Sequence, residues 1–337
     1  MKKFHTYSVL FGIILLALLI WKIGPKALWR ELALLGWGLV PLILIEGVAD
    51  IFHTLGWRYC LTGPHRSLPF FQLFRIRMAG SSINYITPTA TLGGEVTKGA
   101  LLASNHGGTD AITSVLIGKL AYALAQLLFV AFGTFFILWK IHLPPGIWPA
   151  MLVSSSLLAA GIVGFLIVQK AGKFGAVARW FVTHNLGGKA LETLAGHLTT
   201  VDEELKCFYT QRPGNLPFAI FWHIVGMACG IVQAWYFLLL LTDHGSFFIA
   251  AGIWFLGSWF DLLTFPIPLG IGIQEGTRVL ALKAVGFDLA LGLTYGVVLR
   301  LEQIFWAGVG LLLYATLLSA KREGGLFPKK EPVGGKP

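Results

Sequence analysis

A glutamate and two basic residues recur twice in this chain, beside the same helix-breaking residue types. The segment PTATLGGEVTK (88–98) aligns without a gap on PLGIGIQEGTR (268–278), so that Glu95 matches Glu275 at an offset of 180 residues. Charged side chains are expensive inside a lipid bilayer and are kept there mainly for function. Duplicated segments interrupted by Pro and Gly are typical of a transport site between two repeats. The duplication therefore predicts such a site.

The chemistry that these residues suit is binding of an anion such as a phosphate. Gly weakens regular helix before each glutamate, so we expect a half-helix to begin near Glu95 and another near Glu275. Their free N–H groups would face the middle of the membrane. One further basic residue follows each motif, Lys119 by 21 positions and Arg300 by 22. The candidate substrate-binding residues are Asn84, Glu95, Thr97, Lys98, Lys119, Glu275, Thr277, Arg278 and Arg300.

Two interpretations of these charges are open. In the first, four basic groups and two helix ends hold a lipid phosphate in a central cavity, and the two glutamates balance the charge or carry a proton. In the second, the pairs Glu95–Lys98 and Glu275–Arg278, at i and i+3, are ion pairs that pin the structure. Glu302 closely follows Arg300 and is expected to neutralise it. Asp261, opposite Ser81 in the alignment, is given no role.

Three more polar residues lie on one face of an apolar segment. Glu46, Asp50 and His53 are spaced at i, i+4 and i+7. They are secondary candidates that either extend the cavity and relay protons, or pair with Arg58 or a neighbouring segment and stabilise packing. The segment matching theirs in the second half offers only His223. His and Cys residues show no metal-ligand spacing, so we expect neither a metal nor a cofactor.

Composition restricts the class of protein. Of 337 residues, 55% are hydrophobic and 12% charged, about half the charged fraction of a soluble domain. No dinucleotide, Walker or HExxH motif is present. The net charge of +10 comes from basic residues flanking apolar runs, which indicates contact with anionic membrane lipids and not with nucleic acid. The chain is predicted to be an all-α polytopic membrane protein.

We expect about six full spans and two re-entrant helical hairpins, the latter at 68–104 and 246–286. An alternative for the second hairpin is an ordinary span at 247–264 followed by a loop at 265–285. Re-entrant backbone is tolerated only where it is buried in protein or lines a wet cavity. The expected spans are 7–22, 37–57, 111–139, 148–168, 215–241 and 288–318.

The distribution of Lys and Arg predicts the orientation. Four Arg in 58–78 and six basic residues in the linker 169–214 place those segments, and both termini, on the cytoplasmic side of a bacterial-type inner membrane. The loop 23–36, with Lys26 and Arg30, is the exception. A single domain, 1–320, then holds an inverted repeat of units 37–139 and 215–318. The linker is expected to be amphipathic, and the tail 321–337 a disordered basic segment.

The motifs resemble those of the flippase-like family named for the transmembrane region of lysylphosphatidylglycerol synthase. The resemblance rests on NYITP (84–88), GEVTK (94–98) and PIPLGIGIQE (266–275), and the pattern of spans extends it over roughly residues 5–320. It implies movement of a lipid between leaflets, in a stand-alone member without the soluble synthase domain. Lys98 stands where many relatives favour arginine. Lysine keeps the positive charge but lacks the bidentate fork with which arginine binds phosphate.

The sequence therefore predicts a transporter and not an enzyme. Its substrate is expected to be a lipid with an anionic, phosphate-bearing head group: a phospholipid, a glycolipid or a polyprenyl phosphate. Enzymes of lipid biosynthesis are possible partners. Two alternatives are a membrane-embedded lipid-modifying enzyme with Glu95 and Glu275 as acid and base, and a scaffold of a lipid-pathway complex that docks through 169–214.

Overall fold

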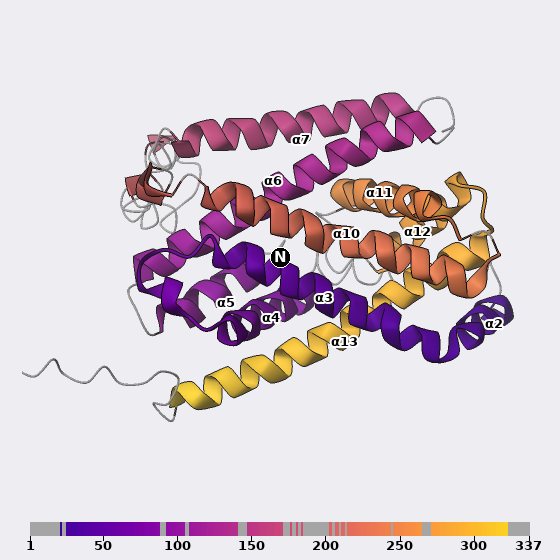
Figure 1. Cartoon of the computed structure of the whole chain (residues 1–337), viewed down its shortest axis with the longest axis horizontal. Coiled ribbons are helices and arrows are strands. Elements are labelled where there is room, and N and C mark those ends of the chain that lie inside the picture. The colour runs from indigo at the N-terminus through magenta and orange to yellow at the C-terminus, as the bar shows by residue number, and fades with distance from the viewer. Residues whose placement is uncertain are drawn as a thin grey trace, which may run out of the picture.

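A computed structural model gives the fold of the chain. It describes residues 21, 25–87, 92–104, 108–140, 147–170, 211–212, 214–243, 245–264 and 271–322, with a few isolated residues between 176 and 210. Within those residues the regular elements are all helices, most of them aligned along one long axis (Figure 1). The expected all-α membrane protein is confirmed. The expected span 7–22, most of the linker 169–214 and nearly all of the tail 321–337 lie outside the described residues.

Among the described residues, four helices are long and apolar enough to cross a membrane, and they match four of the expected spans. They are Leu32–Arg58, Asp110–Lys140, Asn215–Leu241 and Leu289–Ser319. They correspond to helices α3 (Leu39–Arg58), α6 (Gly108–Lys140), α10 (Asn215–Leu241) and α13 (Leu289–Arg322). Helix α7 (Ile147–Lys170) coincides with the expected span 148–168. The segment 23–36, expected as the connection between the first two spans, contains helix α2 (Pro25–Leu35).

Two pairs of shorter helices occupy the expected hairpin regions. In the first, α4 (Phe70–Ile86) packs against α5 (Leu92–Ala103), and in the second, α11 (Phe247–Thr264) packs against α12 (Ile273–Ala284). Helices α5 and α12 have 12 residues each, a length of about 18 Å. That is shorter than a hydrocarbon core of roughly 30 Å. The alternative of a loop over 265–285 is wrong, since most of it is α12.

Helices α3 and α10 lie side by side and antiparallel at the centre of the molecule (Figure 1). At one end the Asn215 amide donates to the Tyr59 carbonyl, 3.1 Å away, and farther along the Gln233 amide donates to the Leu42 carbonyl at 2.8 Å. Glycines allow this close packing. A Cβ on Gly56 would lie 2.9 Å from the His223 ring, which packs directly against that glycine.

Contacts between the remaining helices recur in the two halves. Helix α4 packs on α13, where the Arg75 guanidinium donates to the Thr316 hydroxyl at 2.7 Å. Helix α11 packs on α6, where the rings of Phe255 and Phe136 are 5.6 Å apart. Under the same offset of 180 residues that aligns the two motifs, Arg75 corresponds to Phe255 and Phe136 corresponds to Thr316. The two halves therefore pack alike and in the same register.

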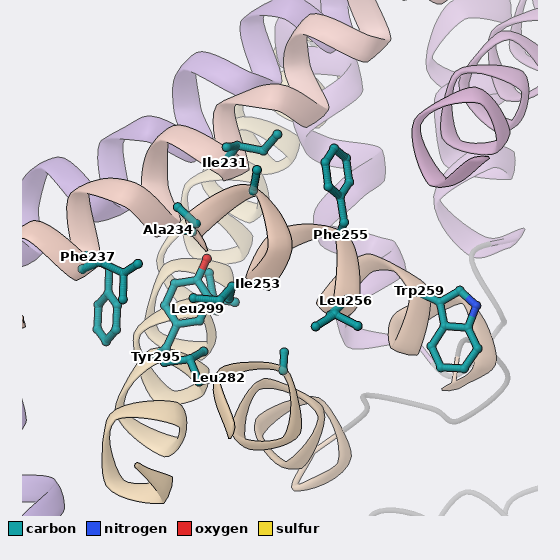
Figure 2. Packing of buried hydrophobic residues seen from close by; sticks show 14 of the residues in the cluster. Ile231, Ala234, Phe237, Ile253, Phe255, Leu256, Trp259, Leu282, Tyr295 and Leu299 are labelled. Carbon is teal, nitrogen blue, oxygen red and sulfur yellow. The ribbon is translucent and has the colours of Figure 1, made fainter. Parts of the chain in front are cut away.

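The second half carries the more extensive buried core. Apolar side chains of α10, α11, α12 and α13 meet in the cluster drawn in Figure 2, where the rings of Phe237 and Tyr295 are 4.8 Å apart. Tyr295 and Phe237 are among the largest side chains that are almost fully buried. A separate cluster in the first half surrounds Trp57, Leu73 and Ile117. One face of the short helix α12 thus packs into this core.

Candidate functional site

The first motif forms a small cluster of charges around Glu95. Its carboxylate accepts a bond from the Lys98 ammonium, with Nζ and Oε1 3.1 Å apart, and the Lys119 Nζ lies 3.7 Å from the same oxygen. Lys98 also lies over the Trp57 ring, 5.7 Å from its centroid. The sequence interpretation of Glu95 and Lys98 as an i, i+3 pair is confirmed, and Lys119 of α6 joins that pair.

Helix α5 begins earlier than the glycines suggested. We expected a helix from near Glu95, but α5 starts at Leu92 and includes Gly93 and Gly94. The reason is the crossing with α4, where a Cβ on Gly94 would lie 2.1 Å from the Gly80 carbonyl oxygen. Asn84 of α4 caps the first turn of α5, because its Oδ1 accepts a hydrogen bond from the Gly94 N–H at 2.6 Å. Glycine here serves close packing and does not break the helix.

A cavity of about 260 Å³ opens beside this cluster. Helices α3, α4, α5, α6 and α10 supply its walls, so it is built from both halves of the chain. Three basic side chains, of Arg77, Lys98 and Lys119, line it together with one carboxylate, that of Glu95, and Arg77 is also paired with Asp50. Polar groups of Ser81, Asn84, Tyr122 and His223 complete the lining. The balance of charge inside this cavity is positive, which favours an anionic ligand.

A second cavity, of about 210 Å³, adjoins the first and shares Arg77, Ser81 and Tyr122 with it. Glu46, Asp50 and His53 line this cavity. Asp50 forms an ion pair with Arg77 of α4, and not with Arg58. The secondary candidates therefore lie beside the first motif, in a neighbouring cavity.

Sequence reasoning missed Arg77 as a site residue. The sequence interpretation counted it among four arginines of a cytoplasmic segment, whereas it lies inside α4 and its side chain is largely buried, 13% exposed. Its flanking residues, Ile76 and Met78, are buried, and an arginine among buried apolar residues was the available signal. Arg77 faces both cavities and so connects them.

A pair of histidines joins α3 to α10 between the two cavities. His53 lines the second cavity and His223 the first, and their Nδ1 atoms are 3.1 Å apart. Both rings pack against Tyr122, with centroid separations of 5.3 and 5.4 Å. His223 had been noted only as the single counterpart in the matching span. The antiparallel packing of α3 and α10, which the sequence does not reveal, makes the two residues partners.

The second motif is buried and paired differently. Glu275 is 1% exposed, its Oε1 accepts a bond from the Arg300 Nε at 2.8 Å, and its Oε2 accepts from the Gly272 N–H at 2.7 Å. Gly272, with φ of 75°, ends the preceding turn in a conformation that favours glycine. The expected start of a helix near Glu275 is confirmed, since α12 begins at Ile273.

The expected pair of Glu275 with Arg278 is wrong. Arg278 binds Asp261 of α11 through two bonds, Nη1 to Oδ1 at 3.2 Å and Nη2 to Oδ2 at 2.5 Å. Asp261, which the sequence interpretation left without a role, therefore clamps α11 to α12. The expected neutralisation of Arg300 by Glu302 is also wrong. Arg300 binds Glu275, and Glu302 accepts a hydrogen bond from Gln233.

The structure does not bring all four predicted basic residues to one cavity. Glu275, Arg278 and Arg300 line neither of the two cavities described above. The threonines of the motifs bond within their own helices, Thr97 to the Gly93 carbonyl and Thr277 to the Gln274 carbonyl. The acid–base alternative needs both glutamates at one cavity, and only Glu95 is there.

Comparison with known proteins agrees with the fold and the motifs. A family model described as the lysylphosphatidylglycerol synthase TM region matches residues 6–311. That match covers most of the chain and both motifs. No curated protein and no solved structure matches the chain.

Proposed function

We propose that this chain, which belongs to the family of the lysylphosphatidylglycerol synthase transmembrane region, moves a phosphate-bearing lipid between the two leaflets of its membrane. Membership of that family implies a lipid-related function in the membrane. The observation that carries the proposal is the cavity in which Arg77, Lys98 and Lys119 face Glu95. An excess of positive charge in a membrane protein suits the phosphate of a lipid head group.

The cluster is arranged so that a phosphate can enter it. Lys119 is 44% exposed and holds Glu95 at 3.7 Å, whereas Lys98 is 14% exposed and closer. In the empty site Glu95 balances the charge of the two lysines. An arriving phosphate would replace Glu95 as the partner of Lys119 and Lys98. The outer face of α5 suits the acyl chains, because Leu92 and Val96 are 66% and 71% exposed. The head group would thus be held inside while the tails remain in lipid.

Alternating access follows if the two halves form an inverted repeat. Helices α3 and α10 are equivalent under the 180-residue offset, yet they pack antiparallel. A two-fold axis that relates them runs across the helices, and so would lie in the membrane plane. The halves would then open to opposite sides, and the present cavity, lined by the first motif, would represent one of two states.

Leaflet exchange in proteoliposomes tests this function. The probe is a fluorescent phosphatidylglycerol in vesicles of phosphatidylethanolamine and phosphatidylglycerol. Loss of a hydrogen bond to a charged group costs about 1.5–3 kcal/mol. We therefore expect Lys98→Gln to bind the head group roughly 10–100-fold more weakly and to slow exchange accordingly.

Lys140→Gln is the matched control, because Lys140 ends the same helix as Lys119 and lies over the Trp139 ring at 3.9 Å, outside both cavities. It should exchange the probe at the rate of the unmodified protein. Equal exchange by the Lys98 and Lys140 variants would remove the cavity from the mechanism. No exchange by the unmodified protein, for any anionic lipid probe, would remove the function.

Two cysteines allow the proposed orientation to be tested. Cys207, in the linker, is exposed, whereas Cys60 is buried, and burial raises the pKa of the Cys60 thiol. In a variant in which the third cysteine, the half-buried Cys229 of α10, is replaced by serine, a membrane-impermeant maleimide should therefore label Cys207 and not Cys60. We expect labelling in inside-out vesicles and none in intact spheroplasts, as a cytoplasmic linker requires. Labelling of Cys207 in intact spheroplasts would reverse the orientation.

A further inference from the structure

Glu302 is a buried carboxyl group for which the described residues offer no ion pair. It is 4% exposed, and its Oε2 accepts a hydrogen bond from the Gln233 amide, whose nitrogen also donates to the Leu42 carbonyl. The other carboxylates of the two motifs and the cavities differ, since Asp50, Glu95 and Glu275 each bind a cation, as does the more exposed Asp261. Only Glu46 shares the situation of Glu302 within the described part of the chain.

The groups that face Glu302 do not supply the missing charge. Glu46 and Asp50 of α3 and Arg278 of α12 interact with it electrostatically, as does Tyr295 of its own helix. Arg278 is committed to Asp261, as described above. Asp50 is committed to Arg77 of α4, and from α10 the facing group is the uncharged amide of Gln233.

An ionised carboxylate in such surroundings is strongly disfavoured. Removing an unpaired charge from water costs several kcal/mol even after relaxation, and the group neutralises instead. The neutral form fits the geometry at Glu302, because Oε2 accepts from Gln233 and the hydrogen would then reside on Oε1. Glu46 leads from this group to water, since it lines the cavity of about 210 Å³, which has room for several water molecules.

We propose that Glu302 is a proton-binding site and that Glu46 passes the proton of Glu302 to and from the second cavity. We also propose that lipid movement is coupled to this proton. The coupling rests on the proposed function, whereas the site itself does not. The charge balances as a proton transfer: Glu302 releases H⁺ to water when it becomes exposed, and the carboxylate takes up H⁺ before it is buried again.

The internal repeat indicates how Glu302 becomes exposed. The offset of 180 residues converts Gln233 to His53 and Glu302 to Tyr122. In the first half that equivalent pair is at the cavities, because Tyr122 lines both of them and its ring lies 5.3 Å from that of His53. In the second half the corresponding pair, Gln233 and Glu302, is buried. When the halves exchange roles, Glu302 occupies the wet position that Tyr122 occupies here.

Infrared difference spectroscopy tests the site without any lipid substrate. The protein is held in an ester-free detergent at neutral pH, and the carbonyl stretch of a protonated carboxyl group is recorded. We expect the component of this band that belongs to Glu302 to be lost in Glu302→Gln, an isosteric change that keeps the bond to Gln233 in the neutral form, and the component that belongs to Glu46 to be lost in Glu46→Gln. Gln233→Met should move the band to higher wavenumber, because it removes the hydrogen bond to the carbonyl.

Glu95→Gln is the matched control, since Glu95 is ion-paired and its replacement should leave the carboxyl band in place. An unchanged band in Glu302→Gln would overturn the proton site. So would a lost carboxylate stretch in that variant, since it would mean that Glu302 is ionised.

Proteoliposomes with an imposed pH gradient and a trapped pH dye test the coupling. With the fluorescent phosphatidylglycerol as probe, the gradient should change the exchange rate of the unmodified protein and should have no effect on Glu302→Gln. Glu302→Asp, which keeps the carboxyl group, should restore part of the response. A gradient response in Glu302→Gln equal to that of the unmodified protein would overturn the coupling. If the unmodified protein moves no probe lipid, the proposed function and the coupling both fail, and the infrared band alone decides the proton site.

Discussion

The two copies of one motif occupy unlike surroundings. Glu95 and its two lysines lie at a cavity, where the carboxylate is 16% exposed and Lys119 44%. Glu275 is 1% exposed, bound to Arg300 and to the Gly272 N–H, and Arg278 is bound to Asp261. The same residue types at the same spacing therefore line a cavity in one half and form ion pairs away from both cavities in the other.

The difference shows that the role of a charged side chain in these motifs depends on which residue it is paired with, and not only on its presence in the sequence. In the first half the cations outnumber the carboxylate at their cavity, so charge remains for a ligand. In the second half Asp261, whose counterpart in the first half is Ser81, takes up Arg278. One added carboxylate converts a binding cluster into a clamp between α11 and α12. Three substitutions separate these two roles.

The largest effect is expected from Glu275→Gln. Removing one member of a buried ion pair leaves the other charge uncompensated and typically costs about 3–5 kcal/mol. Glu275→Gln should therefore lower the midpoint of thermal unfolding in detergent strongly, followed by intrinsic fluorescence. Glu95→Gln is its matched variant and should change the midpoint little, because water reaches its lysines. Equal destabilisation by the two variants would erase the contrast between a wet and a dry motif.

A smaller effect is expected from Gly94→Ala, at the crossing of α4 and α5. The new methyl group would lie 2.1 Å from the Gly80 carbonyl oxygen, a backbone atom that cannot move aside alone. Overpacking of this kind costs about 1–3 kcal/mol. Gly99→Ala in the same helix meets nothing within 4 Å and should be neutral or stabilising, by up to roughly 1 kcal/mol. The same thermal measurement compares them, and an unaffected Gly94→Ala would mean that this crossing is loose.

The smallest effect is expected from Arg278→Lys. Lysine keeps the charge next to Asp261 but loses the two-bond fork, so we expect a cost of about 1 kcal/mol. Arg75→Lys, at the contact of α4 with α13, replaces an arginine for which a single bond, to Thr316, is seen, and it should be silent. A silent Arg278→Lys would show that Asp261 needs only a positive charge, which would make the second motif resemble the first more closely.

Much of the fold could be predicted because it rests on local signals. Apolar runs of about 20 residues locate spans, and four of the expected ones agree with the helices to within a few residues. The hairpin regions were marked by Pro, Gly and charge. The start of α5 was misplaced because Gly93 and Gly94 weaken a helix by propensity, and the sequence does not show that α4 approaches closely enough to require them.

Ionic partners could be predicted only within a helix turn. The Glu95–Lys98 pair follows from i, i+3 spacing, which is fixed by helix geometry. The pairs Arg77–Asp50 and Arg278–Asp261 join different helices, and their spacing along the chain carries no signal. For the same reason His53 was assigned without His223, and Glu302 was assigned to Arg300 and not to Gln233.

The sequence by itself determined that this is a helical membrane protein with a duplicated charged motif, because hydropathy and the spacing of residue types are properties of the chain alone. Only the tertiary structure decided which copy of the motif meets a cavity and which is sealed in the core. That choice depends on the antiparallel packing of α3 on α10 and on where Asp261 and Gln233 fall, which are contacts between residues far apart in the chain.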